Sequence, residues 1–333
     1  ITSYEEVSVV GITEILKHLP SLMKAMDRIV AEAGKRKPAL AILTDFPGFH
    51  LRLARKLQPK GIRNVYYICP QFWAWRPWRA KLIRRRFVKA LCIFPFEKDF
   101  FSNAGIPTQF IGHPLVGTVS APKDRRQFCE AHALVSARPV VTVLPGSRSA
   151  ELAHHLPVLQ EACARIYAKM PVQFVLAAAH PKDVSLLKTG WPHALRPCVV
   201  EGETYNALAA ADASIVSSGT ATVEAALLDA PMVVVYRVSP LTAALAKPLV
   251  RTPYFAMVNL IAEKKVVPEL VQNDFTPERV AAEILRLLQD PNARSTMRTG
   301  LAEVRKHLGP PGAAERAADA ITALLGRGAG NDS

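Results

Sequence analysis

Short apolar runs alternate with helix-like spacing along most of this 333-residue chain. The runs are rich in β-branched residues, and polar or glycine-containing sequence follows each one, which is the pattern of buried strands that end at a turn. Strands that alternate with helices are typical of parallel sheets covered by helices on both faces, so the chain predicts an α/β fold with two Rossmann-like domains. The expected strands are 39–43, 65–69, 91–94, 108–111, 140–144, 172–177, 198–200, 213–216 and 231–236.

Helices are predicted between and around these strands. Apolar residues recur at helical spacing over 7–34, where Pro20 is expected to mark the joint between two helices. Further helices are expected over 51–57, over 96–103 and along most of 277–325.

The boundary between domains is expected near 112–120, where glycine and proline interrupt the pattern. A chain of this length has room for about two domains. We expect an N-terminal domain over 1–115, a C-terminal domain over 116–325 that includes the terminal helices, and a flexible glycine-rich tail over 326–333. An α/β domain usually opens on a strand, whereas this chain opens on a helical stretch. The N-terminal domain is therefore expected to lack its first strand or strands.

The composition restricts the kinds of partner. A formal net charge of +14 indicates an anionic partner, such as a charged ligand, nucleic acid or an acidic membrane surface. Five scattered cysteines favour a reducing compartment over a disulfide framework, and their spacing matches no metal site. The sequence contains no apolar run of about 18 residues that would span a bilayer as a helix.

One turn carries a charged residue at the end of an expected strand. The strand over 140–144 stops at Pro145-Gly146-Ser147, and Arg148 follows directly. Open α/β sheets bind ligands outside the carboxyl ends of strands, where backbone N–H groups of a turn and a helix start favour an anion. An arginine there adds a bidentate contact to phosphate. The turn predicts a phosphate site, and the alternative is an ordinary strand–turn–helix corner with a surface arginine.

A second turn consists of small residues, Ser217-Ser218-Gly219-Thr220, and Glu224 lies one helical turn further on. Small residues let the backbone approach a ligand closely, and the helix start adds a positive dipole. A carboxylate at Glu224 suits two vicinal ribose hydroxyls. The alternative is a first-turn residue that only complements the helix dipole.

A basic and aromatic segment interrupts the first half of the chain. Tryptophans are interleaved with basic residues, and 76–89 contains no acidic residue. A basic helix with an aromatic edge is typical of a segment that lies on an anionic membrane surface. A solvated face of a basic domain is the bland alternative, and nucleic-acid binding is a third, although no recognised nucleic-acid motif accompanies the segment. The basic residues are Arg76, Arg79, Lys81, Arg84, Arg85, Arg86 and Lys89.

Taken in order, the motifs of this chain resemble one enzyme family, the lipid-A-disaccharide synthases, which are glycosyltransferases of the two-domain GT-B type. The resemblance runs from about Val9 to Leu325; single motifs are weak, but Trp-Ala-Trp-Arg and the ordered series are specific. It rests on Val-Val-Gly-Ile-Thr-Glu-Ile-Leu at 9–16, Asp45-Phe-Pro-Gly-Phe, Pro70-Gln-Phe-Trp-Ala-Trp-Arg76, Phe94-Pro-Phe-Glu-Lys98, Phe110-Ile-Gly-His-Pro114, Leu144-Pro-Gly-Ser-Arg148, Ser218-Gly-Thr-Ala-Thr-Val-Glu224 and Tyr236-Arg237.

The resemblance implies an inverting hexosyltransferase. Its reaction joins UDP-2,3-diacylglucosamine to 2,3-diacylglucosamine 1-phosphate and gives a β(1→6) lipid A disaccharide 1-phosphate and UDP. Such a transfer needs a base for the acceptor hydroxyl and positive groups for the departing diphosphate. Asp45 matches the family's essential aspartate and is the expected base, with an Asx turn before Pro47 as the alternative. Arg148 matches the arginine at the donor diphosphate and is expected to act on the leaving group.

The same resemblance implies further contact residues. His113 is a candidate for the cleft between the domains, although a lone histidine after glycine is more often structural. The expected acceptor or membrane contacts are Trp73, Trp75, Arg76, Arg79, Arg84 and Arg85. The expected contacts to the donor and its UDP are Gly146, Ser147, Ser218, Gly219, Thr220, Glu224, Asn259 and Gln272.

Cofactors, partners and location follow from these expectations. No metal or other cofactor is expected, because helix starts and Arg148 can neutralise the diphosphate and the chain has no Asp-x-Asp cluster. The expected partners are acylated UDP-glucosamine, acylated glucosamine 1-phosphate and an anionic membrane surface, without nucleic acid; a homodimer is left open. The expected location is the cytoplasm of a Gram-negative-type bacterium, peripheral on the inner face of the inner membrane.

The chain departs from the family pattern at its front. Family members begin with a strand and a Gly-Glu-Ala-Ser-Gly-Asp loop, and the sequence contains neither, so the activity of the chain as given stays open. Another UDP-sugar enzyme of the same fold, such as a different GT-B transferase or a UDP-N-acetylglucosamine epimerase, is the first alternative. A basic membrane- or nucleic-acid-binding protein, in which the turns are only scaffold, is the second.

Overall fold

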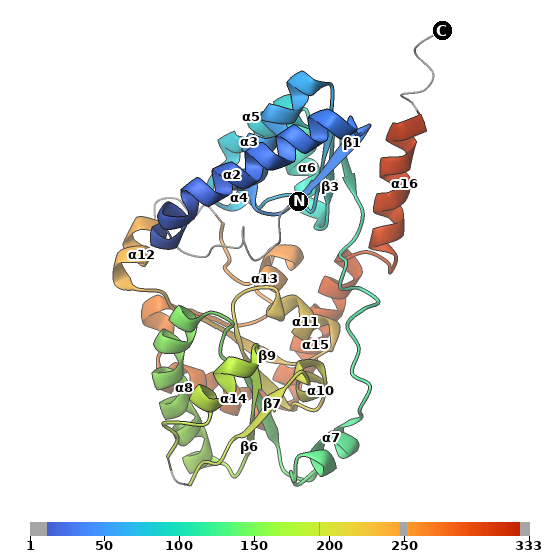
Figure 1. The fold of residues 1–333 in the computed structure, drawn as a ribbon. Helices are drawn as coiled ribbons and strands as arrows, with labels where there is room; N and C mark the ends of the chain where they lie inside the picture. Colours follow the sequence, from blue (N-terminus) through green and yellow to red (C-terminus); the bar gives the residue numbers. More distant parts are fainter. Residues whose placement is uncertain (1–11, 193, 247–251, 327–333) are drawn as a thin grey trace. The chain divides into compact units, whose positions relative to one another are not determined.

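The computed structural model describes residues 12–192, 194–246 and 252–326 (Figure 1). The contacts within the chain define two compact units. The first runs up to Pro114 and includes the chain from Gly312 onward, and the second is Leu115–Pro311. Each unit is built on one parallel sheet, so the prediction of an α/β fold with two parallel-sheet domains is confirmed.

The first unit contains a four-stranded sheet in the order β1-β2-β3-β4. The strands are β1 (Leu40–Thr44), β2 (Arg63–Tyr67), β3 (Lys89–Cys92) and β4 (Thr108–Phe110). The helices and 3-10 turns of this unit are α2 (Ile12–Arg36), α3 (Pro47–Leu57), η1 (Gln58–Lys60), α4 (Phe72–Trp75), η2 (Pro77–Arg79), α5 (Ala80–Arg86), α6 (Pro95–Asn103) and α16 (Ala313–Gly326).

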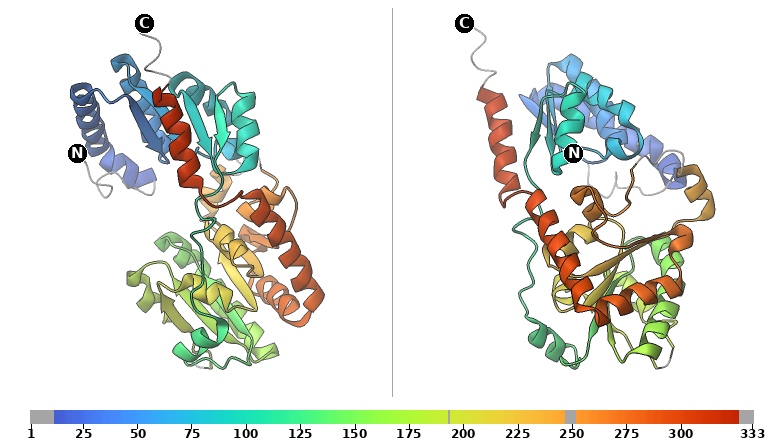
Figure 2. Two further views of the ribbon diagram at one scale, coloured as in Figure 1. Left: turned by 90° about the vertical axis from the view of Figure 1, so that its right-hand side faces the viewer. Right: turned by 180° about the vertical axis from the view of Figure 1, so that it is seen from behind.

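Both faces of this sheet are covered. Successive side chains of a strand point to opposite faces. Tyr66 therefore packs in one core cluster with residues of α2, α3, α5 and α6, whereas its neighbour Val65 packs with Leu91 against Ala317 and Ala320 of α16. Figure 2 shows α16 alongside these strands. The sequence analysis assigned this last helix to the second domain; the small side chains of α16 instead close the open face of the first sheet.

Two helix predictions in the first unit need correction. α2 continues through Pro20 as one helix, because the proline removes a single backbone hydrogen bond and Leu22 and Met26 anchor the helix in the core after it. The predicted start of this helix, 7–11, lies outside the described residues. The basic segment is not one helix: Pro77 cannot continue α4, so the chain passes through η2 and α5, and Lys89 already opens β3.

The second unit contains a six-stranded parallel sheet in the order β10-β9-β8-β5-β6-β7. The strands are β5 (Val140–Leu144), β6 (Gln173–Ala178), β7 (Cys198–Glu201), β8 (Ala213–Ser217), β9 (Met232–Tyr236) and β10 (Glu269–Val271). The helices and 3-10 turns are α7 (Arg125–Ala131), α8 (Ser149–Lys169), η3 (Pro181–Asp183), α9 (Val184–Leu187), α10 (Thr204–Ala209), α11 (Ala221–Leu227), α12 (Pro240–Ala246), α13 (Met257–Ala262), η4 (Gln272–Asp274), α14 (Pro277–Gln289) and α15 (Pro291–His307).

The central strands of this sheet, β5 and β8, are buried along their whole length. They lie side by side, with Leu144 in register with Val216. The chain leaves β5 toward β6 and β7 on one side, then returns to β8 on the other side and continues to β9 and β10. The carboxyl ends of β5 and β8 therefore form the topological switch point at which open α/β sheets bind ligands.

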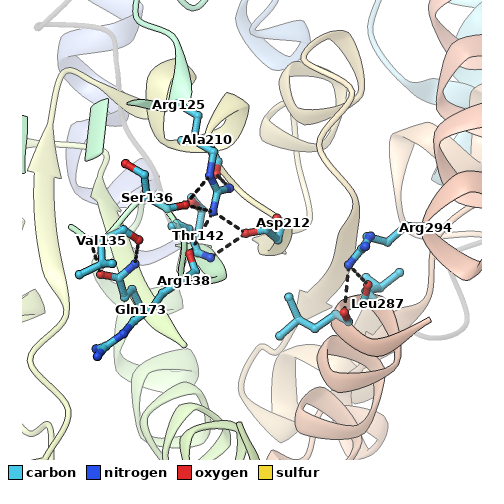
Figure 3. Close-up of polar contacts among 12 residues, drawn as sticks. Arg125, Val135, Ser136, Arg138, Thr142, Gln173, Ala210, Asp212, Leu287 and Arg294 are labelled. Carbon is cyan, nitrogen blue, oxygen red and sulfur yellow. Dashed lines mark hydrogen bonds and ion pairs between the residues drawn. The ribbon is translucent and has the colours of Figure 1, made fainter. Parts of the chain in front are cut away.

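The amino ends of the same strands are closed by a polar network (Figure 3). Arg125 of α7 donates to the carbonyls of Ala210 and Arg138 at 2.5 and 3.0 Å and forms an ion pair with Asp212 at 2.9 Å. Asp212 also accepts from the backbone N–H of Val140, the first residue of β5, at 2.8 Å. This network supplies hydrogen-bond partners to backbone groups of the loops that lead into β5 and β8.

Short elements account for most of what the sequence analysis missed in this unit. β10 has three residues and pairs only at the edge of the sheet with β9, so it carries little of the apolar pattern of a buried strand. α7 was not among the expected helices, because it begins within the polar residues 120–126. Its signal is Asp124, whose carboxylate caps the helix by accepting from the backbone N–H of Gln127 at 2.8 Å.

Candidate functional site

A pocket of about 540 Å³ lies outside the carboxyl ends of the central strands in the second unit. Its floor includes Leu144 at the end of β5 and Ala177 near the end of β6. Two turns supply much of the wall, 146–148 after β5 and 217–221 after β8. The pocket therefore occupies the switch point of the sheet. It brings together the following residues that the sequence assigned to the donor: Gly146, Ser147, Arg148, Ser218, Gly219, Thr220 and Glu224.

The first turn requires glycine for two reasons. Gly146 has a φ of 126°, and a Cβ at this position would lie 2.7 Å from Oε2 of Glu151. The Glu151 carboxylate, nearly buried in the first turn of α8, accepts from the backbone N–H of Ser147 at 3.1 Å and of Arg148 at 3.4 Å. Its other oxygen accepts from Nη1 of Arg148 at 2.9 Å. Glu151 thus fixes the turn and one edge of the guanidinium.

Arg148 remains available to a ligand despite this contact. Its side chain is 61% exposed and lines the pocket, and the contact to Glu151 uses only one nitrogen of the guanidinium. Arginine carries five N–H donors, so the remaining donors can bind phosphate oxygens.

The second turn is open toward the pocket. Gly219 has a φ of 156°, near extended backbone, and no atom lies within 4 Å of the position of an added Cβ. The hydroxyl of Ser218 donates to the carbonyl of Phe255 at 3.1 Å, which fixes the turn to the chain before α13. The hydroxyl oxygen of Ser217 is buried and has no hydrogen-bond partner among the residues that the structure describes. Backbone can therefore approach a ligand here without a side chain between them.

Glu224 lies in α11 and lines the pocket together with Tyr205 of α10. The Tyr205 hydroxyl donates to Oε1 of Glu224 at 3.4 Å. Burial raises the pKa of the Glu224 carboxyl, and the hydrogen bond from Tyr205 opposes that shift. A half-buried carboxylate held on one side by a phenol keeps its second oxygen for hydroxyl donors of a ligand.

Tyr205 and Glu151 are pocket residues that the sequence analysis did not single out. Tyr205 follows Gly202-Glu203-Thr204, a polar and glycine-containing turn after β7, so it carries the same signal as the two turns that were selected. Glu151 lies three residues after Arg148 at the start of a helix, which is the spacing of a capping box.

His155 connects the first turn to the neighbouring strand. It is completely buried, and its Nδ1 lies 2.7 Å from the carbonyl oxygen of Pro145. Its Nε2 accepts from the backbone N–H of Arg237, just after β9, at 2.9 Å. Accepting at Nε2 places the ring proton on Nδ1, where it donates to Pro145. Burial lowers the pKa of His155, in keeping with the neutral ring that acceptance at Nε2 requires.

Asn259 and Gln272 do not line this pocket, in contrast to their assignment from sequence. Asn259 is completely buried: its amide nitrogen donates to the carbonyl of Val267 at 3.0 Å and to Glu269 at 2.7 Å, and its oxygen accepts from two backbone N–H groups. These contacts fix the connection between α13 and β10. The backbone carbonyl of Gln272 accepts from Arg237 at 3.1 Å. Both residues hold loops next to the sheet.

Asp45 lies in the first unit, directly after β1. Its backbone is left-handed, with a φ of 51°, and its carbonyl accepts from the Tyr66 hydroxyl at 2.9 Å and lies 2.8 Å from Nδ1 of His50. The carboxylate is exposed and makes no hydrogen bond or ion pair within the described part of the chain. An Asx turn would need an N–H two residues on, and Pro47 has none. The structure thus leaves the carboxylate of Asp45 available.

His113 is buried, at 5% exposure, in the first unit and packs its ring against Phe94 with 5.3 Å between centroids. Burial lowers the pKa of His113 to about 4, so the ring is neutral at physiological pH. These observations describe a packed core histidine.

The tryptophans of the basic segment have different environments. Trp73 is half-buried, and its indole N–H donates to Glu97 at 3.1 Å; burial raises the pKa of that carboxyl to about 7. An indole N–H near the core needs an acceptor, and Glu97 supplies it; the assignment of Trp73 to acceptor or membrane contact stays a prediction. Trp75 and Trp78 are 36% and 60% exposed, and the Arg76 guanidinium lies 4.4 Å from the Trp75 ring. Arg84 and Arg85 are exposed on α5.

The described residues contain neither a cluster of metal-binding side chains nor a helix that could cross a bilayer. No group of three or more His, Cys, Asp or Glu side chains is arranged to hold a metal ion within ranges 12–192, 194–246 and 252–326. None of the helices described in these ranges has both the length and the apolar character needed to cross a bilayer.

Comparison with known proteins gives relatives at high coverage. A family model described as lipid-A-disaccharide synthetase matches residues 1–321. The chain is 44% identical to the lipid-A-disaccharide synthase of Solibacter usitatus and 40% identical to that of Myxococcus xanthus, in each case over 96% of this chain and 84% of the relative.

Similar solved structures share the fold at low sequence identity. The UDP-GlcNAc 2-epimerase of Neisseria meningitidis bound to UDP-GlcNAc has a TM-score of 0.57 at 11% identity, with coverage of 90% of this chain and 82% of that one. A calicheamicin glycosyltransferase has a TM-score of 0.54 at 19% identity, with coverage of 97% and 83%. At these identities the likeness concerns the fold alone.

Proposed function

The chain belongs to the lipid-A-disaccharide synthase family, a family of glycosyltransferases of lipid A biosynthesis, and on this premise we propose that the pocket of its second unit binds the UDP part of the sugar donor. The observation that carries the proposal is the convergence of two glycine turns, an exposed guanidinium and a half-buried carboxylate at the switch point of one sheet. These groups match the parts of UDP: N–H donors and Arg148 suit the diphosphate, and Glu224 suits ribose hydroxyls.

In this proposal Arg148 acts on the leaving group. Negative charge develops on the diphosphate as the glycosidic bond to UDP breaks, and a positioned guanidinium stabilises that charge. The contact to Glu151 pre-orders the side chain, so less freedom is lost when the transition state forms. The open turn at Gly219 supports a second set of backbone contacts.

We assign the general base to Asp45. An inverting transfer needs a carboxylate that takes the proton of the acceptor hydroxyl as the new bond forms. The exposed carboxylate of Asp45, on a turn fixed through its own carbonyl by Tyr66 and His50, supports this role. The scheme uses Arg148 and backbone donors for charge neutralisation and requires no metal.

The acceptor and donor in this proposal are acylated glucosamine derivatives, a 2,3-diacylglucosamine 1-phosphate and its UDP-linked counterpart. Their acyl chains favour a reaction at a membrane surface, on the cytoplasmic side. The exposed side chains of Trp75 and Trp78, next to a run of arginines, support peripheral contact with anionic lipid.

The test follows UDP release from the protein with both acylated substrates, in buffer with and without EDTA. We expect release in both buffers. A folded sample that releases UDP only with added divalent metal would contradict the metal-free scheme. UDP-N-acetylglucosamine, which lacks the long acyl chains, provides the second arm, because its turnover without an acceptor would favour an epimerase of the same fold.

Asp45→Ala is expected to reduce turnover by about 10²–10⁴-fold, the usual contribution of a general base. UDP affinity and thermal stability should stay near wild type, because the carboxylate makes no contact within the described residues. Asp99→Ala, which removes an exposed carboxylate of α6, is the matched control. An unchanged rate in Asp45→Ala would eliminate this residue as the base.

A further inference from the structure

A second pocket, of about 230 Å³, lies within the first unit and is lined by four arginines. Arg52 and Arg55 extend from α3, Arg79 ends η2, and Arg86 ends α5. We call this set the arginine pocket. The remaining lining is mainly apolar: Pro47, Gly48, Leu51, Trp78 and Leu82.

The positive charge of the arginine pocket is not neutralised by the protein. None of its four guanidinium groups forms an ion pair with a carboxylate in the described part of the chain. Arg86 donates to the backbone carbonyl of Leu51 at 3.0 Å, and Nε of Arg79 is buried without a hydrogen-bond partner among the described residues. A buried donor without a partner is unfavourable, and so are like charges around one pocket.

Burial and this crowding together lower the pKa of two of the four arginines. Burial lowers the pKa of Arg79, and the charges of Arg76 and Arg52 lower it further. Burial likewise lowers the pKa of Arg86, with added repulsion from Arg55 and Arg85. Both groups remain charged at physiological pH, so an anion in the pocket would relieve the repulsion and supply the missing acceptors.

The chemistry of the lining defines the anion. Guanidinium groups match the oxygens of phosphate in bidentate geometry. The apolar side of the pocket, with Leu51, Leu82 and the exposed ring of Trp78, suits a lipid body next to the charged group. Pro47 and Gly48, which line the pocket, follow Asp45 in the same turn. We infer that the arginine pocket binds the phosphate group of an acylated lipid.

Two sources can present this chemistry: the phosphate diester of a membrane phospholipid and the phosphate monoester of an acylated sugar. The inference stands on the first unit alone and does not depend on the assignment of UDP to the second. Two exposed lysines of the same unit, Lys35 of α2 and Lys60 of η1, provide a charge-matched comparison, because they do not line the pocket.

The test is isothermal titration calorimetry with short-chain lipids below their critical micelle concentrations. Dihexanoyl phosphatidylglycerol supplies the diester, a dihexanoyl glucosamine 1-phosphate supplies the monoester, and dihexanoyl phosphatidylcholine is the zwitterionic control. The wild type, Arg52→Gln/Arg55→Gln and Lys35→Gln/Lys60→Gln are compared. Arg52 and Arg55 are exposed, so folding should be retained; circular dichroism and UDP affinity verify this.

We expect the wild type to bind an anionic lipid phosphate at one site. The pocket double variant should weaken binding by about tenfold or more, since two charge-assisted contacts are lost, whereas the lysine double variant should stay within about twofold. A preference for the monoester assigns the pocket to a sugar phosphate, and a preference for the diester assigns it to membrane lipid. Equal losses in the two double variants, equal binding of phosphatidylcholine, or no binding of either anionic lipid overturns the inference. Because UDP affinity is measured in the same samples, such a failure is distinct from a failure of the donor site.

Discussion

Arg125 and Arg148 lie at opposite ends of the same central strands, and the surroundings of the two arginines differ. At the amino ends, Arg125 donates to three backbone carbonyls, those of Ala210, Ser136 and Arg138, and pairs with the Asp212 carboxylate; its side chain is 33% exposed. At the carboxyl ends, Arg148 has one contact to Glu151 and is 61% exposed. The donors of Arg125 bind groups of the fold, whereas Arg148 is held in position by Glu151 and keeps free donors.

This difference shows how one sheet separates stability from function. Backbone groups of the loops at the amino ends are satisfied by side chains of the protein itself. Turns at the carboxyl ends are shaped by Gly146 and Gly219 and leave donors for a ligand. The same residue type should therefore give opposite phenotypes at the two ends.

Of the two arginines, Arg148 should affect activity far more when it is replaced by alanine. We expect turnover to fall by about 10²–10³-fold, because a preorganised charge on the leaving group is lost, while the midpoint of thermal unfolding stays nearly unchanged. Steady-state UDP release and a thermal melt measure the two quantities on the same sample. Arg165→Ala, on the exposed side of α8, is the control for loss of a charge from this helix. If Arg148→Ala lost stability and turnover in proportion, the arginine would belong to the scaffold.

Arg125→Ala should give the reverse result. Removing this side chain leaves the carbonyls of Ala210, Ser136 and Arg138 without this donor and the Asp212 carboxylate without its ion pair, which should lower the free energy of unfolding by about 2 kcal/mol. Turnover of the folded protein should stay near wild type at a temperature well below the melt. Urea unfolding monitored by circular dichroism gives the free energy. A drop in turnover without a change in stability would break the distinction between the two ends.

The sequence predicted the turns at the carboxyl ends of these strands better than the contacts at their amino ends. Pro145-Gly146-Ser147 and the Ser217–Thr220 turn carry local signals, because a strand that stops at glycine reads the same in the sequence as in the fold. The Arg125–Asp212 pair joins residues far apart in the chain, so no local pattern announces it. Asn259 was assigned to the pocket from its family-like sequence context. That context does not show that its side-chain amide donates to Val267 and Glu269, residues that follow it in the chain.

The first unit shows the same limit. Its strands were visible as apolar runs, but α16 reaches the sheet from the other end of the chain, and the contact of Ala317 with Val65 cannot be seen in either segment alone. The arginine run was visible too. Which arginines line a pocket depends on the break at Pro77 and on Arg52 and Arg55 from another helix, so it required the structure.

Glu224→Gln tests a second ligand contact in the pocket at the carboxyl ends of the strands. The amide keeps the size of the side chain and its contact with Tyr205 but loses the charge that favours two hydroxyl donors. We expect UDP to bind about tenfold more weakly, and the preference for UDP over 2′-deoxy-UDP to shrink. Titration calorimetry with both nucleotides measures the two affinities. Tyr205→Phe should give a smaller loss of the same kind, and an unchanged preference in Glu224→Gln would remove the ribose assignment.

For His155, which contacts the turn after β5, we expect a smaller effect on the free energy of unfolding, and this effect depends on pH. Its ring is neutral because Nε2 accepts from Arg237, and burial lowers the pKa of the folded state below the ordinary value of 6.5. A lowered folded pKa means that the unfolded chain binds the proton more readily, so this contribution to stability is complete above about pH 6.5 and is lost as the pH falls below it. One proton changes the free energy of unfolding by at most about 1.4 kcal/mol per pH unit. His155→Gln keeps an acceptor but cannot titrate, and it should flatten this part of the acid limb in urea unfolding between pH 7 and 5. The half-exposed neighbour His154→Gln is the control. If both variants followed the wild-type curve, the link between the Pro145 turn and β9 would not depend on a neutral imidazole.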